Sequence, residues 1–572
     1  MSRLKPTSLA PVAVLAAVTL SMALSPGTAP WLGTPLEAQT RSFTRADTLR
    51  GSIGPERAWW QVGFYDLHVA VNPADSTIAG SNRIVFTALA AGDVMQIDLQ
   101  EPLRVDSVIG GAGALEFRRE GAAHFVSLGS AMAEGEAGEV TVFYGGTPVV
   151  AVNPPWDGGF IWREDSAGRP WVATANQGLG ASVWWPTKDH QTAEPDSMRI
   201  AITIPEPLTN VSNGRLREVK DNGDGTRTWV WFVANPINNY NVAVNAAVYA
   251  HFGEVYEGLD GPLDLDFWVL EADLVRAHRQ FIQVRPMLAC FEDWFGPYPF
   301  YEDGFKLVHT PHLGMEHQSA VAYGNGFQNG YRGRDLSNTG WGLLWDFIII
   351  HEAGHEWFGN NITTADVADM WVHEGFTNYS ENLYTECIYG KEAGAEYVRG
   401  TRGLIQNDRP VIGVYGVQSE GSSDMYYKGG NLLHTIRQIV DDDALWKEIL
   451  RGLNRDFRHQ VVTSAQVEAY VAEKSGKELA RVFDQYLRHA GIPTFQYSLD
   501  GLDGEGVRYR WVADVEGFDM PIRVWMGDTA VWLEPSTEWQ ETPVTGLSEE
   551  GGEAAFEVDP NFYVEVQRVD SR

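Results

Sequence analysis

The run His351-Glu352-Ala353-Gly354-His355, followed eighteen intervening residues later by Glu374, constrains this chain more than any other feature. Residues four apart in a helix lie on one face, one turn apart, so His351 and His355 can bind one metal ion together. Two imidazoles and the Glu374 carboxylate form a typical zinc set with an open fourth position. Glu352 can reach that position and deprotonate a water molecule there, as metal-assisted amide hydrolysis requires.

The neighbouring residues predict that this run lies in a buried helix. The apolar stretch 345–350 is long enough to bury a helix and to keep the ligands in a dry interior. A second helical segment, expected over about 366–384, places Glu374, Asn378 and Glu381 along one stripe. The alternative is a surface helix with ordinary histidine and glutamate side chains.

A carboxylate is also expected behind the ligands. A histidine that binds a metal ion usually donates its other ring proton to a carboxylate or a carbonyl, which fixes its tautomer. Asp369 and Glu381 are both candidates, because each lies within two helical turns of Glu374. We favour Glu381; the alternative is a merely solvated glutamate.

Four further segments, taken with the first motif, give the chain a family resemblance. They are Trp371-Val372-His373-Glu374-Gly375-Phe376, Leu313-Gly314-Met315-Glu316-His317, Tyr426-Tyr427-Lys428-Gly429, and Asn176-Gln177-Gly178-Leu179-Gly180-Ala181 leading to Trp184-Trp185-Pro186. In their order along the chain, with the first motif between the second and third of them counted from the N-terminus, they resemble the M1 aminopeptidases, the gluzincin branch of the zinc peptidases, over about residues 60–490. The resemblance implies one zinc ion per chain, bound by His351, His355 and Glu374, with Glu352 as the general base.

The resemblance also implies how a substrate is held. An aminopeptidase must bind a free α-ammonium, and a buried carboxylate is an efficient partner for it. Glu316 is our candidate, on a strand with Gly314 and Met315 that packs into the cleft; the alternative is a solvated loop glutamate. Gln177 would add a neutral acceptor, unless it is a polar turn residue.

A tyrosine is expected to stabilise the oxyanion of the tetrahedral intermediate. The family motif Tyr-x-Lys-Gly assigns this role to Tyr426, and Tyr427 is the neighbour with which it could be confused.

Two residues depart from the family pattern. His317 stands where Asn is common, and Leu179 stands where many members carry an acidic or amide group near the substrate amine.

Composition favours an exported protein. Residues 1–38 have basic residues, then an apolar run, then Ser25-Pro26-Gly27, which is the form of a secretory signal peptide cleaved near Ala38. An uncleaved anchor is the alternative.

With 43 basic and 76 acidic residues, the net charge of −33 argues against nucleic acid or anionic membranes as partners. Cys290 and Cys387 could form a disulfide, but no sequence feature brings them together.

The fold expected is multidomain α+β. Alternating residues such as Leu67, Val69 and Val71 predict strands in an N-terminal β domain over 42–258, which fits the saddle-like domain of the family. Helical patterns over 259–490 fit a thermolysin-like catalytic domain, and alternation returns over 491–572 as a small β-sandwich. No membrane span is expected in the mature protein.

These features predict a zinc-dependent aminopeptidase in the periplasm or outside the cell, with peptides that have a free N-terminus as substrates. A thermolysin-like endopeptidase is one alternative, since it uses the same zinc set without needing Glu316. A non-catalytic peptide-binding protein on an M1 fold is another, although the complete motif weighs against it. An epoxide hydrolase is disfavoured because the family members with that activity carry a helical C-terminal domain. Cobalt or manganese could replace zinc in vitro.

Overall fold

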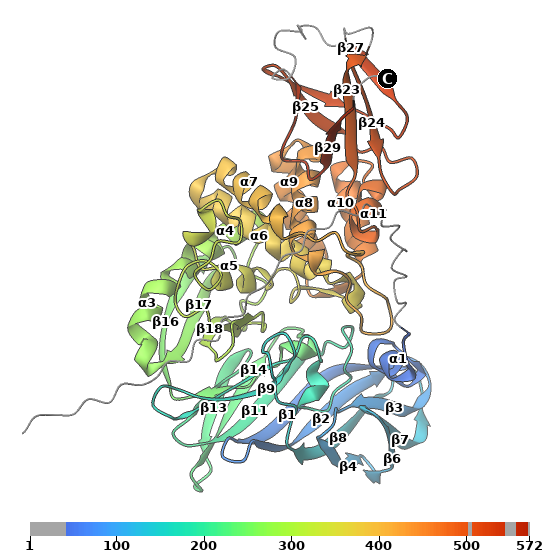
Figure 1. The fold of residues 1–572 in the computed structure, drawn as a ribbon. Coiled ribbons are helices and arrows are strands. Elements are labelled where there is room, and N and C mark those ends of the chain that lie inside the picture. The colour runs from blue at the N-terminus through green and yellow to red at the C-terminus, as the bar shows by residue number, and fades with distance from the viewer. Residues whose placement is uncertain (1–41, 502–505, 544–555, 570–572) are drawn as a thin grey trace, which may run out of the picture. The chain divides into compact units, whose positions relative to one another are not determined.

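The computed structural model describes residues 42–501, 506–543 and 556–569 (Figure 1). The proposed signal peptide, residues 1–38, lies outside these ranges. The described chain is α+β, as predicted: strands dominate up to about residue 270, helices dominate from there to residue 488, and strands follow again. None of the described helices is long and apolar enough to cross a membrane.

An eight-stranded sheet is the largest element of the N-terminal region. Its strands, in spatial order, are β13 (Arg215–Asp221), β14 (Thr226–Val233), β11 (Ser197–Pro205), β1 (Trp60–Asn72), β2 (Thr77–Ala88), β8 (Ala137–Gly146), β4 (Arg104–Gly110) and β5 (Gly113–Leu115). The predicted alternation is confirmed in β1, where Leu67, Val69 and Val71 are buried while His68 and Ala70 are exposed. One face of this sheet therefore forms the N-terminal core.

A smaller sheet in this region positions Gln177. Its four strands, in spatial order, are β12 (Thr209–Val211), β15 (Asn245–Ala247), β10 (Pro170–Ala175) and β9 (Gly159–Glu164). A separate three-stranded sheet consists of β3 (Gly92–Asp98), β7 (Ala123–Met132) and β6 (Phe117–Glu120). Asn176 follows β10 directly, and its amide donates hydrogen bonds to the carbonyls of Tyr240 and Val242, both at 3.1 Å. Gln177 therefore lies beside the segment that carries Tyr240.

A five-stranded sheet carries Glu316. Its strands in spatial order are β16 (Tyr249–Gly258), β17 (Gly261–Leu270), β18 (Phe305–His309), β20 (Val321–Tyr323) and β19 (Gly314–Met315), so Glu316 follows the edge strand. β16 and β17 pair as a hairpin across residues 258 and 259, where we expected one domain to end and the next to begin. β16 thus belongs to the sheet of Glu316, and the four domain ranges stay a prediction.

Helices form the region that follows (Figure 1). They are α4 (Val284–Phe295), α5 (Phe347–Gly354), α6 (Trp371–Tyr389), α7 (Lys391–Gly400), α8 (Tyr427–Val440), α9 (Asp443–Asp456), α10 (Ser464–Ser475) and α11 (Ala480–Arg488); the shorter α1 (Arg45–Gly51), α2 (Pro55–Ala58) and α3 (Leu274–Gln280) precede them. α6 begins at Trp371, after a 3₁₀ turn at Val367–Asp369, and so starts later than the segment predicted from residue 366.

Two sheets follow α11, in agreement with the predicted small β-sandwich. In spatial order their strands are β27 (Gln540–Pro543), β24 (Gly506–Val512), β23 (Thr494–Gly501) and β29 (Glu565–Arg568), then β26 (Thr529–Leu533), β25 (Ile522–Met526) and β28 (Phe556–Val558). The rings of Tyr497 and Phe556 pack between the sheets with their centroids 4.6 Å apart.

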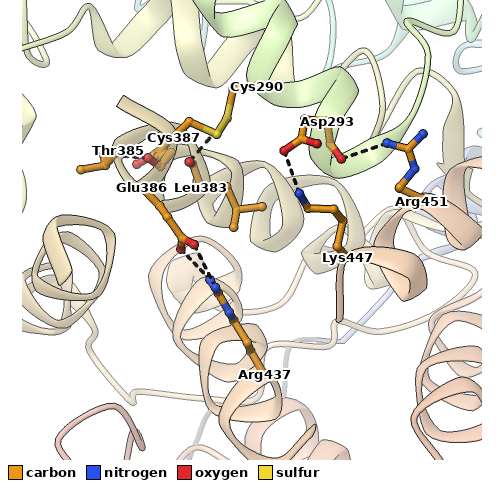
Figure 2. Close-up of a disulfide and its surroundings, with 10 residues drawn as sticks. Cys290, Asp293, Leu383, Thr385, Glu386, Cys387, Arg437, Lys447 and Arg451 are labelled. Atoms are coloured by element: carbon orange, nitrogen blue, oxygen red, sulfur yellow. Dashed lines mark hydrogen bonds and ion pairs between the residues drawn. A yellow bond between two sulfur atoms is a disulfide. The ribbon is translucent and has the colours of Figure 1, made fainter. Parts of the chain in front are cut away.

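Figure 2 shows a disulfide bond between Cys290 of α4 and Cys387 of α6, a pairing that the sequence left open. Beside it, Arg437 of α8 makes a bidentate ion pair with Glu386 of α6, with distances of 2.7 and 2.9 Å between the guanidinium nitrogens and the carboxylate oxygens. The disulfide and the ion pair tie α6 to its neighbours at the end opposite Glu374.

Replacing Cys290 and Cys387 together by Ala is expected to destabilise the protein by about 2–5 kcal/mol, because a cross-link over such a long loop restricts the unfolded chain. The two residues are 97 positions apart in sequence. Thermal unfolding with and without reductant measures the effect. Reductant should lower the Tm of the wild type to that of the variant and leave the variant unchanged. Equal Tm values under oxidising conditions would contradict the prediction.

Candidate metal centre and substrate cleft

Helix α5 carries the first motif and is wholly buried. The carboxylate of Asp346 caps its N-terminus by accepting a hydrogen bond from the backbone N–H of Ile348 at 3.1 Å. The helix ends at Gly354, but His355 keeps helical backbone angles. The rings of His351 and His355 therefore stay on one face, with their centroids 5.0 Å apart.

The three predicted ligands converge on one point. Nε2 of His351 and Nε2 of His355 lie 3.6 and 3.3 Å from Oε2 of Glu374. Zinc bonds of 2.0–2.2 Å in a tetrahedron separate neighbouring ligand atoms by about 3.3–3.6 Å. Glu374 Oε2 is buried and has no hydrogen-bond partner among the described residues, as expected for an atom that binds a metal ion. The geometry and the donor set both fit zinc.

The other ring nitrogens are held by the protein. His351 Nδ1 lies 2.8 Å from Glu381 Oε1, and His355 Nδ1 lies 3.0 Å from the carbonyl oxygen of Phe358. Asp369, the other candidate, accepts hydrogen bonds from Tyr415 and from the backbone of Ser464 instead. These contacts leave both Nε2 atoms directed toward Glu374. Burial lowers the pKa of His351, but Glu374 and Glu381 outweigh it and raise that pKa well above its usual range, so the centre favours positive charge.

Replacing Glu381 by Gln is expected to weaken zinc binding by about 10- to 100-fold, because the imidazole of His351 loses a charged partner that orients it. Glu381 also accepts a hydrogen bond from Tyr397 at 2.8 Å, which Gln can retain through its carbonyl oxygen. Competition with a chelator of known affinity measures the change, and circular dichroism checks that the fold is kept. Unchanged zinc affinity would refute the role of Glu381.

Glu352 packs directly against β19. A Cβ atom at Gly314 would come within 2.6 Å of Glu352 Oε1, so this close approach requires glycine. Met315, the next residue, lines the same cleft and is buried. Burial raises the pKa of Glu352 to about 8, which a nearby metal cation would lower again. Glu352 is thus positioned as a base close to the ligands without being one of the three.

Glu316 forms a separate polar pocket beside the ligands. Its Oε1 accepts hydrogen bonds from Gln177 Nε2 at 2.7 Å and from the Tyr240 hydroxyl at 3.1 Å. Carboxylate oxygens of Glu316 and Glu352 and a ring nitrogen of His355 lie within 4.8 Å of one another. Burial raises the pKa of Glu316, and no Lys or Arg side chain pairs with it in the described part of the chain. A buried carboxylate of this kind is stabilised by an incoming cation.

Tyr426 is brought to the cleft by a close contact between helices. A Cβ atom at Gly429 of α8 would lie 2.9 Å from the Cα atom of Gly375 of α6, so glycine allows the two backbones to meet. Tyr426, at the start of α8, stacks against His351 with ring centroids 6.1 Å apart. Burial and the charge of Glu374 raise its pKa well above the usual value, so the phenol stays protonated. Tyr427 also lines the cleft; burial raises its pKa, and the largest charge effect on that pKa comes from Glu381.

The two residues that depart from the family pattern do not line the cleft. His317 is buried, its ring nitrogens have no hydrogen-bond partner among the described residues, and burial lowers its pKa to about 3. The backbone carbonyl of Leu179 accepts hydrogen bonds from Arg50 and Gln100. Gln177 and Gly178, in contrast, do line the cleft.

The structure adds residues that the sequence did not single out. The cleft has a volume of about 580 Å³, and Glu420 and Arg334 are among the residues that line it. Tyr240 lies behind Glu316. Tyr240 lies in a short 3₁₀ helix and the other two lie between the motifs, and no spacing rule links these three residues to the ligands.

A model of the peptidase family M1 domain matches residues 344–486, which include all three ligands, Glu352 and Tyr426. Residues 344–486 therefore contain a peptidase family M1 domain. Among curated M1 relatives, aminopeptidase N of Lactococcus lactis is 28% identical over 34% of this chain and 25% of its own length. Mouse aminopeptidase B is 23% identical over 59% of this chain and 53% of its own length. The chain therefore spans about half or less of these relatives.

Solved structures agree on the fold. The M1 zinc metallopeptidase from Deinococcus radiodurans superposes with a TM-score of 0.64 at 20% sequence identity. The superposition covers 78% of this chain and 97% of that one. At this identity the likeness establishes the fold of the M1 region.

Proposed function

We propose that this M1 family member is a zinc-dependent aminopeptidase that removes N-terminal residues from peptides. The observation that supports it best is the position of Glu316, a buried carboxylate with two hydrogen-bond donors and no Lys or Arg partner in the described chain, next to Glu352 and His355. A peptide whose α-ammonium binds Glu316 presents its first peptide bond to the metal centre. Binding of the amino end thus sets the site of cleavage.

The residues of the chain divide the chemistry among them. A bound zinc ion supplies Lewis acidity toward the scissile carbonyl. Glu352 accepts a proton from the attacking water and passes it to the leaving amine. The Tyr426 hydroxyl, kept protonated by its surroundings, donates a hydrogen bond to the developing oxyanion. Glu316 holds the ammonium group, and Gln177 directs its amide at Glu316 while its carbonyl oxygen can accept from the substrate.

The relatives support the same activity. Those cited above are aminopeptidases, and a mutant form of the Deinococcus radiodurans enzyme binds a Tyr-Ser-Ala substrate. Because the chain spans only part of the curated relatives, its own substrates have to be measured.

A matched pair of peptides tests the proposal, one with a free N-terminus and one N-acetylated, with products identified by mass. We expect the purified protein to trim only the free peptide, one residue at a time, to lose activity on chelation and to regain it with zinc. Internal cleavage of the acetylated peptide at a similar rate would establish an endopeptidase. Failure to cut either peptide with zinc bound would support the non-catalytic alternative.

We also propose that the protein is exported to the periplasm or the medium. The disulfide between Cys290 and Cys387 supports this, because such bonds persist in oxidising compartments. The signal-like segment at residues 1–38 and the acidic composition are consistent with it. Fractionation of cells, with N-terminal sequencing of the mature protein, tests both export and cleavage near Ala38.

A further inference from the structure

Arg334 is a cation in the cleft that the proposed chemistry does not use. Its side chain is exposed and lines the same cavity as Glu316 and Glu352. Among the described residues its guanidinium makes no hydrogen bond and no ion pair, whereas many other arginines of the described chain are paired with carboxylates. In a chain with a net charge of −33, an arginine left without a carboxylate inside a substrate cleft indicates a ligand that supplies one.

Arg334 lies on a loop that packs against the His351 side of the metal centre. Its backbone pairs with that of Tyr331 through hydrogen bonds of 2.9 and 3.1 Å. The ring of Tyr331 packs on Phe347 with centroids 5.3 Å apart, and Phe347 stacks on His351 at 5.1 Å. Glu316, in contrast, lies near His355.

The direction of a bound peptide follows from these positions. Its amino end lies at Glu316 and its first peptide bond at the metal centre, so the part released by cleavage extends past His351 toward Tyr331 and Arg334. A cleft of about 580 Å³ is of the size that holds a small ligand, so a short peptide would place its other end within it.

We propose that Arg334 binds the C-terminal carboxylate of short peptide substrates, and this assignment rests on the proposed aminopeptidase function. The planar guanidinium can donate two parallel hydrogen bonds to a carboxylate, which an amide cannot match. Because the side chain is exposed, solvent weakens the pairing and the effect belongs mainly in KM. The enzyme therefore prefers short peptides with a free C-terminus over the same peptides with a C-terminal amide.

The test compares a tripeptide acid with its amide on the wild type, Arg334→Gln and Arg332→Gln. Arg332 is a matched control, since it has the same charge on the same loop but lies over the Trp156 ring, 5.6 Å from its centroid. We expect the wild type and Arg332→Gln to favour the acid by about 3- to 10-fold in kcat/KM. Arg334→Gln should abolish the preference by raising KM for the acid alone. Equal kcat/KM for acid and amide in the wild type, or an equal loss on both in Arg334→Gln, would overturn the assignment.

Two further arms identify the source of the carboxylate and separate this inference from the proposed function. The preference should disappear for six-residue peptides, and a tripeptide amide with Asp at its third position should not recover it; recovery would assign Arg334 to acidic side chains instead. If no peptide is cleaved, the proposed function fails, and calorimetric binding of the tripeptide acid and amide to the zinc-loaded protein still decides the role of Arg334. Equal affinities would refute it.

Discussion

Replacing Glu352 by Gln is expected to lower kcat by about a thousandfold while leaving bound zinc unchanged, because an amide cannot accept a proton from water. Glu352 packs against Gly314 in the wall of the cleft and is not one of the three residues that converge as ligands. Steady-state kinetics on a free peptide, with zinc measured by elemental analysis, test both parts of the prediction.

The two readouts separate a lost base from a damaged metal site. A variant that loses zinc together with activity would indicate that Glu352 supports the ligands. A variant that keeps zinc and activity within a few-fold of the wild type would show that another group removes the proton. Glu316, whose carboxylate is also close to His355, would then be the first residue to examine.

Replacing Glu316 by Gln is expected to lower kcat/KM for peptides with a free N-terminus by about a hundredfold or more. The substrate ammonium would enter a buried pocket that no longer carries a compensating charge, and such a loss costs about 2–5 kcal/mol. Gln177 and Tyr240 would remain but cannot supply negative charge. Kinetics on the free and the acetylated peptide measure the effect.

Glu420→Gln is the matched control for Glu316, since it removes the same charge from the same cleft. We expect it to change kcat/KM only a few-fold, because Glu420 is exposed whereas Glu316 is buried. Equal losses in the two variants would mean that overall charge, and not a specific ammonium pocket, attracts the substrate. Faster cleavage of acetylated peptides by Glu316→Gln would indicate that Glu316 had been excluding them.

The sequence predicted the candidate ligand set because helix geometry relates His351 to His355 and the spacing of the family motif adds Glu374; helical spacing then relates Glu374 to Glu381. Spacing could not predict contacts between loops. Tyr240 reaches Glu316 from 76 residues away, and its position depends on how the strands around it pack. The Cys290–Cys387 pairing depends in the same way on the packing of α4 against α6.

The strand at the expected domain boundary illustrates a second limit. β16 follows a long run of strands, and alternation alone gives no sign that its partner is β17 in the sheet of Glu316. Period-2 patterning shows that a segment is a strand but does not name the sheet that it joins. Domain limits in a chain of this kind therefore need pairing information.

The hydrogen bonds to Glu316 have a consequence for how such enzymes acquire their selectivity. In the proposed mechanism the hydrolytic groups all lie within residues 351–426, whereas Gln177 and Tyr240, which donate hydrogen bonds to Glu316, come from segments that precede them in the sequence. If Glu316 binds the substrate ammonium as proposed, recognition of the peptide N-terminus depends on the contact between these segments and Glu316, and not on the zinc motif alone. Substitutions at these contacts could convert an enzyme that trims peptides from the N-terminus into one that cleaves them internally, while every zinc ligand stays in place.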